Sequence, residues 1–154
     1  MKINKTFNFL LRINIFYYIV IWLFVFILVN MLSLLFPESS LDNHTVSIMP
    51  QFIKPYIVIF YGPLLETLIF QALIISGICF FVVRPRKNFY FSVIASSLVF
   101  ALVHLYSIYY FIFGLLIGFV LAVAYYFARY RKENAIIPIF LIHSIWNFIV
   151  FIAE

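Results

Sequence analysis

The sequence predicts an all-α fold, a multi-pass integral membrane bundle of about five transmembrane helices in a single domain over residues 1–154. Composition is the first reason, because hydrophobic residues make up 67% of the chain and charged residues only 10%. Soluble domains contain roughly 45–50% apolar and about 25% charged residues. Length is the second reason, since 154 residues leave room for about four or five spans and for no separate soluble domain.

The first apolar run extends from Ile13 to Phe36 and follows Lys2, Lys5 and Arg12. This run is longer than the ~7–15-residue core of a signal peptide, and no small-residue cleavage pattern follows it. We therefore expect a retained first span. The connection from Pro37 to Pro55 is the only sizeable polar stretch, and its prolines oppose a continuous helix.

The second apolar run extends from Tyr56 to Val83 and contains one acidic residue, Glu66. If the helix begins at Pro63, a residue favoured in the first turn, Glu66 lies near one face of the membrane. If the helix begins near Tyr56 and bends at Pro63, Glu66 lies deeper. The sequence leaves both placements open.

The third apolar run, from Phe89 to Phe127, is too long for one span. As a single helix it would measure about 60 Å, twice the hydrocarbon thickness of a bilayer. We therefore expect a helical hairpin that turns within His104–Tyr109. The return helix carries Gly114 and Gly118, a GxxxG pattern that permits close helix approach. A last span is predicted from about Ala135 to Ala153.

Basic residues give the predicted orientation in a cell membrane. Apart from Lys54, these spans place every lysine and arginine on one side of the bilayer: Lys2, Lys5, Arg12, Arg84, Arg86, Lys87, Arg129, Arg131 and Lys132. The positive-inside rule then makes the N-terminus cytoplasmic and the C-terminus external. Topology also accounts for the formal net charge of +5, and the chain has no pattern typical of nucleic-acid binding, so no nucleic-acid partner is expected.

Glu66 is the polar residue that most demands an explanation. A carboxylate at membrane depth costs at least ~2.5 kcal/mol on insertion scales, and intramembrane carboxylates are usually functional. The alternative is a neutral carboxylic acid that is hydrogen-bonded to a neighbouring helix.

Three helices each carry polar side chains that have a partner four residues away, and this spacing places both members of a pair on one helix face. Thr67 and Gln71 lie on the Glu66 helix, His104 follows Phe100, and Asn147 follows His143. Because unpaired polar groups in lipid cost several kcal/mol, we expect these faces to meet at one water-containing chamber. The residues on these faces are Glu66, Thr67, Gln71, Phe100, His104, His143 and Asn147.

The three patterns resemble, in the same order, the motifs EExxxR, FxxxH and HxxxN of the CAAX protease and bacteriocin-processing (CPBP) family of intramembrane glutamic endopeptidases. The corresponding stretches are Glu66-Thr67-x-x-x-Gln71, Phe100-x-x-x-His104 and His143-x-x-x-Asn147. The resemblance covers roughly residues 55–151, which we expect to form the catalytic core.

The resemblance implies roles for four residues and a substrate class. Glu66 and His104 would activate a water molecule, while His143 and Asn147 would stabilise the oxyanion. A peptide or lipidated peptide in the bilayer would be the substrate, and no cofactor would be needed. Processing of bacteriocins, or immunity to them, is among the functions that the family name implies.

Two positions depart from the family pattern, since Thr67 replaces the second Glu and Gln71 replaces the Arg. Both replacements are neutral, so neither leaves an unpaired charge in the membrane. We expect Thr67 and Gln71 to hydrogen-bond with each other and, together with Phe100, to support the catalytic residues.

Two other functions stay open. Glu66, His104 and His143 are a possible ligand set for a catalytic zinc ion with water in the fourth position, as in a metalloprotease. The chain could instead be a catalytically impaired membrane binding or immunity protein, given Thr67 and Gln71. The natural substrate and the oligomeric state have no signal in the sequence.

Overall fold

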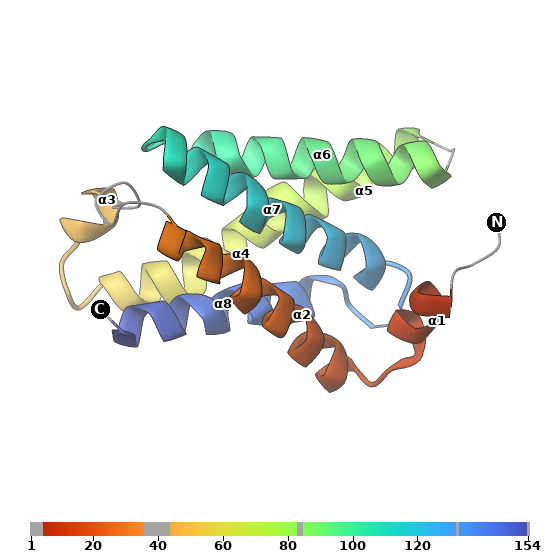
Figure 1. The fold of residues 1–154 in the computed structure, drawn as a ribbon, viewed down its shortest axis with the longest axis horizontal. Helices are drawn as coiled ribbons and strands as arrows, with labels where there is room; N and C mark the ends of the chain where they lie inside the picture. Colours follow the sequence, from red (N-terminus) through yellow and green to blue (C-terminus); the bar gives the residue numbers. More distant parts are fainter. Residues whose placement is uncertain (1–4, 36–43, 83–84, 132, 154) are drawn as a thin grey trace.

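Five helical rods cross the molecule in the computed structural model, which describes residues 5–35, 44–82, 85–131 and 133–153 (Figure 1). Every regular element in these residues is a helix. The rods are α2 (Ile15–Asn30), the composite helix Tyr56–Phe81, α6 (Pro85–Val103), α7 (Ile108–Ala128) and α8 (Ile136–Ala153). Their number and order are those predicted from the apolar runs.

The apolar composition of the rods fits a membrane. Tyr56–Phe81 and Ile108–Ala128 are long and apolar enough to cross a bilayer, and α2, α6 and α8 provide shorter apolar helices. Together they confirm the predicted all-α membrane fold.

The N-terminal region contains a helix that the sequence did not predict. Helix α1 (Lys5–Arg12) ends before the first rod, and α2 begins after Asn14, whose Oδ1 accepts a hydrogen bond from Phe16 N at 2.8 Å. This N-cap satisfies one of the free N–H groups at the start of α2 and separates the two helices. A short 3₁₀ helix, η1 (Met31–Leu35), extends α2.

The segment between the first two rods is only partly described. Of the predicted polar connection, residues 37–43 lie outside the described ranges, and α3 (His44–Ser47) follows them.

Arg131 connects the N-terminal region to the loop between α7 and α8 through hydrogen bonds. Its guanidinium group donates to the carbonyl oxygens of Leu10 and Ile13, the second at 2.8 Å, and lies over the Tyr18 ring at 4.8 Å. The Tyr18 hydroxyl in turn donates to the carbonyl oxygen of Ala124 at 2.6 Å. Arg131 is thus a buried connector as well as one of the basic residues that predict topology.

Helices α6 and α7 form the predicted hairpin, with the turn between Val103 and Ile108. A methyl group at Gly118 would lie 3.0 Å from the Cδ1 atom of Phe100, closer than ordinary van der Waals contact. The absence of a side chain at Gly118 therefore makes room for the Phe100 ring and brings the two helices together.

The helix that carries Glu66 runs without interruption from Tyr56 to Phe81. It consists of a π-helical segment η3 (Tyr56–Tyr61), α4 (Gly62–Glu66), a second π-helical segment η4 (Thr67–Leu73) and α5 (Ile74–Phe81). Pro63 therefore lies inside the helix, which is the arrangement for which a deeper Glu66 was predicted. Glu66 lies roughly 15 Å along the axis from the start of the helix.

The rods place the two chain ends at opposite sides of the molecule. In Figure 1, α1, the beginning of α6 and the end of α7 gather near the N-terminus, whereas α3, the turn between α6 and α7 and the C-terminus lie on the other side. The basic stretches of the sequence thus flank one end of the bundle, as predicted.

Candidate active site

Glu66 lies between two histidines that come from different helices. Its Oε1 atom is 3.8 Å from Nε2 of His104, and its Oε2 atom is 3.6 Å from Nε2 of His143. Both distances exceed the usual range of a hydrogen bond. The structure therefore brings together three of the four residues predicted to be catalytic, with each imidazole facing a different carboxylate oxygen.

The three side chains of the cluster differ in exposure. The exposed fraction of the side chain is 25% for Glu66, 16% for His104 and 6% for His143. Glu66 and His104 are therefore partly exposed, whereas His143 is buried.

His104 is oriented by its contacts beyond the end of α6. Its Nδ1 atom lies 2.7 Å from the carbonyl oxygen of Phe100, and its ring stacks on the Phe100 ring with centroids 4.4 Å apart. Since a carbonyl oxygen can only accept, Nδ1 carries the hydrogen. In the neutral imidazole, Nε2 then presents its lone pair to Glu66. The ring of Tyr110, which the sequence did not single out, lies parallel to His104 at 6.1 Å.

Phe100 also connects the two histidines. Its ring is 6.2 Å from that of His143 and meets Phe70 edge to face at 5.6 Å. On the far side of His143, the ring of Phe26 in α2 lies 6.1 Å away. The predicted supporting role of Phe100 thus has a visible basis, since it contacts both imidazoles.

Asn147, the fourth residue predicted to be catalytic, contacts the main chain of the Glu66 helix. Its Nδ2 atom donates to the carbonyl oxygen of Val58 at 2.8 Å. One turn earlier on α8, Ser144 Oγ donates to the carbonyl oxygen of Ile59 at 2.6 Å. Sequence reasoning missed Ser144, although a hydroxyl beside His143 in an otherwise apolar run was the available signal.

Thr67 and Gln71 point into the protein interior and are fully buried. Within the described residues, neither the Thr67 hydroxyl nor either polar atom of the Gln71 amide has a hydrogen-bond partner. The predicted bond between the two side chains is therefore wrong. A shared helix face brings the two Cβ atoms close but does not orient the polar atoms toward each other.

No set of three His, Cys, Asp or Glu side chains within the described residues is arranged so that it could hold a metal ion. The proposed zinc ligands Glu66, His104 and His143 lie near one another, with the carboxylate between the two rings, but they do not form such a set.

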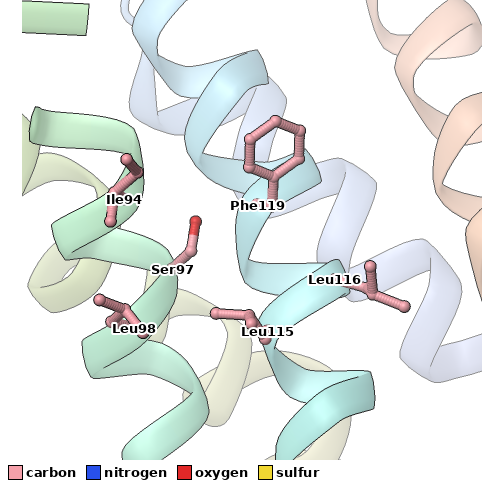
Figure 2. Close-up of a pocket in the computed structure, with 6 residues that line it drawn as sticks. All are labelled: Ile94, Ser97, Leu98, Leu115, Leu116 and Phe119. Atoms are coloured by element: carbon pink, nitrogen blue, oxygen red, sulfur yellow. The ribbon is translucent and has the colours of Figure 1, made fainter. Parts of the chain in front are cut away.

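A separate cavity of about 290 Å³ lies between α6 and α7. Its lining is apolar apart from one hydroxyl, as Figure 2 shows, and consists of Ile94, Ser97, Leu98, Leu115, Leu116 and Phe119. The Ser97 hydroxyl already donates to the carbonyl oxygen of Val93 in its own helix at 2.7 Å. None of the predicted catalytic residues lines this cavity, so it is distinct from the candidate active site.

Comparison with known protein families gives a match over most of the chain. The sequence model of a family described as Type II CAAX prenyl endopeptidase Rce1-like matches residues 48–149. This range contains Glu66, His104, His143 and Asn147, and it covers most of the chain. No curated protein and no solved structure matches the chain.

Proposed function

Because the chain belongs to the Type II CAAX prenyl endopeptidase Rce1-like family, a family of membrane proteases, we propose that it is an intramembrane endopeptidase that hydrolyses a peptide bond. One observation supports the proposal above all. The Glu66 carboxylate faces the imidazoles of His104 and His143 at 3.8 Å and 3.6 Å, within a bundle of predominantly apolar helices.

The gap between Glu66 and His104 suits a water molecule. Both the carboxylate and the unprotonated Nε2 of His104 are acceptors, so they cannot bond directly to each other. A water between them can donate one hydrogen to each, which holds it and increases its nucleophilicity. Glu66 and His104 thus have the role of positioning and activating the water.

The proposed reaction then follows the usual course of amide hydrolysis. The water oxygen adds to the substrate carbonyl carbon while Glu66 takes up a proton, and this forms a tetrahedral oxyanion. His143 Nε2, and the second hydrogen of the Asn147 amide group, are the proposed donors to that oxyanion. Breakage of the C–N bond returns the proton from Glu66 to the leaving amine.

The proposed substrate is a peptide or lipidated peptide that reaches Glu66 from the bilayer. The proposed orientation has the N-terminus in the cytoplasm, because the basic stretches flank one end of the bundle. Exposed Lys87 and Gln51 suit a labelling test of this orientation in a Cys79→Ala background. Cysteines at the two positions should react from the cytoplasmic and external sides respectively, and the reverse result would invert the topology.

A peptide library incubated with the purified protein in detergent tests the function. Glu66→Gln should lower turnover by roughly 10²-fold or more, because a general base contributes ~10²–10⁴-fold. Glu133→Gln is a matched control, since that side chain is about half exposed (48%) and pairs with Arg131 away from the site. Equal cleavage by wild type and Glu66→Gln would refute the proposal.

The same experiment separates the two alternatives. Cleavage that stops on chelation and returns with zinc would favour the metalloprotease with Glu66, His104 and His143 as ligands. The absence of any cleavage by folded wild-type protein would favour a catalytically impaired binding or immunity protein. The unpartnered, buried Thr67 and Gln71 are the observation that supports this second alternative.

A further inference from the structure

The helix that carries Glu66 contains a proline, which leaves a gap in its main-chain hydrogen bonding. Pro63 has no N–H group, so it cannot donate to a carbonyl in the preceding turn. That acceptor would be Ile59 at α-helical spacing or Val58 at π-helical spacing, four or five residues earlier. A main-chain carbonyl without a donor is costly inside a bundle of apolar helices, so another donor is needed.

Both carbonyls receive a hydrogen bond from α8. Ser144 Oγ donates to Ile59 at 2.6 Å, and Asn147 Nδ2 donates to Val58 at 2.8 Å. The two side chains thus supply donors at the place where Pro63 cannot.

The local backbone is shaped for this contact. The N–H of Gly62 donates to the carbonyl oxygen of Ile57, a spacing of five residues that is typical of a π-helix. A Cβ atom at Gly62 would lie 2.9 Å from that same oxygen, so a larger residue would disturb the turn. Segments of π-helix are common at functional sites.

The same stretch of α8 also carries His143. From this stretch, Ser144 and Asn147 hold the carbonyls before Pro63, while Nε2 of His143 faces Oε2 of Glu66 at 3.6 Å. Glu66 lies roughly 10 Å along the helix from Ile59. Two bonds between α8 and η3 therefore set the distance and the angle at which the carboxylate meets the imidazole.

We propose that Ser144 is a positioning residue, and that Asn147 has a positioning role besides any oxyanion role: their bonds to Ile59 and Val58 replace the donor that Pro63 lacks and fix Glu66 against His143. The proposal rests on the proposed peptidase function for its catalytic consequence. The two hydrogen bonds themselves do not depend on it.

A double-mutant cycle between Ser144 and Pro63 tests the proposal. Ser144→Ala removes one donor, and Pro63→Ala restores a main-chain N–H that can reach Ile59. Ser144→Ala should lower kcat, measured per folded protein, by about 10-fold or more with KM unchanged, because small displacements of a catalytic group are costly. Ser144→Thr keeps the hydroxyl and should recover most of this loss. In the Pro63→Ala background, Ser144→Ala should have a much smaller effect.

Ser97→Ala is the matched control, since the Ser97 hydroxyl also donates to a main-chain carbonyl, but within its own helix. Its kcat should stay close to that of the wild type. If Ser144→Ala does not insert, Ser144→Cys carries the same test with a weaker donor. Strictly additive effects of Ser144→Ala and Pro63→Ala on kcat, or an unchanged kcat in Ser144→Ala, would overturn the positioning role.

The midpoint of thermal unfolding in detergent provides the readout that needs no substrate. Coupling between Pro63 and Ser144 in unfolding, with no peptide cleavage by the wild type, would refute the proposed function and support the two bonds. Cleavage that depends on Glu66, without coupling in either readout, would refute the bonds as replacements for the Pro63 donor and leave the peptidase function in place.

Discussion

The two histidines that face Glu66 belong to regions held together by different kinds of contact. In the α6–α7 hairpin, the His104 ring stacks on the Phe100 ring, and Phe100 fits against Gly118. The hydrogen bond of this imidazole stays within its own chain segment, to the Phe100 carbonyl oxygen, so packing is what connects the two helices of the hairpin here. Between the Glu66 helix and α8, hydrogen bonds from Ser144 and Asn147 to main-chain carbonyls connect the two partners.

Packing and hydrogen bonds respond to different kinds of substitution. Close packing is sensitive to volume, because interiors have few voids and extra atoms force side chains to move. Hydrogen bonds are sensitive to direction and to the presence of a donor, and a buried carbonyl without a donor is costly. Substitutions that change volume should therefore affect the hairpin most, whereas substitutions that change polar atoms should affect the Glu66 helix and α8.

Phe100→Ala should have the largest effect on stability. The ring is 3% exposed and contacts Phe70 and both histidines, so its removal leaves a cavity at the centre of the site. Removal of a buried phenylalanine costs about 3–5 kcal/mol. Chemical unfolding in detergent measures the loss. Phe119→Ala in the same hairpin is the control, because Phe119 is 49% exposed and should lose far less. Equal losses would show that the hairpin is not held by Phe100.

Gly118→Ala should have an intermediate effect. The new methyl group would lie 3.0–3.2 Å from three atoms of Phe100, and overpacking of this kind typically costs about 1–3 kcal/mol. At Gly114 the nearest atoms would be 3.5 Å away, and at Gly77 nothing lies within 4 Å. The free energy of unfolding should therefore fall most for Gly118→Ala, less for Gly114→Ala and not at all for Gly77→Ala. A different order would contradict the packing model of the hairpin.

Sequence patterns predicted the parts of the molecule that depend on composition and periodicity. The five rods follow from the lengths of the apolar runs, and the hairpin follows from a run too long for one span. Helix spacing and family resemblance also predicted the residues that converge at Glu66, namely His104 and His143. These features arise within single segments or from recognisable motifs, and the structure contains all of them.

The features that escaped prediction depend on contacts between distant segments. Pro63 was compatible with two different starts of the Glu66 helix. The structure contains the continuous helix, whose main-chain carbonyls accept hydrogen bonds from Ser144 and Asn147, more than eighty residues later in the chain. Burial of Arg131 against Leu10 and Ile13 has the same origin, since one side chain joins two ends of the chain. Local sequence contains the donors in these contacts but does not identify their acceptors.

Thr67→Val should have the smallest effect on the free energy of unfolding. The sign of this effect tests whether a hydrogen bond also holds the Thr67 face of the Glu66 helix. The Thr67 hydroxyl is fully buried without a hydrogen-bond partner among the described residues, whereas the Ser144 hydroxyl is bonded. Valine has nearly the same shape as threonine and lacks the hydroxyl. Because an unpaired buried polar group costs about 1–3 kcal/mol, Thr67→Val should leave the free energy of unfolding unchanged or raise it by up to ~1 kcal/mol.

Thr67→Ser is the matched variant, because it keeps the hydroxyl and removes a buried methyl group. It should lower the free energy of unfolding by about 1 kcal/mol, the usual cost of a lost methyl in a packed interior. Chemical unfolding of both variants in detergent measures the two signs. A loss in Thr67→Val comparable to that in Ser144→Ala would contradict this expectation. It would mean that the Thr67 hydroxyl has a partner, for example a water molecule shared with Gln71, and that hydrogen bonds hold both faces of the Glu66 helix.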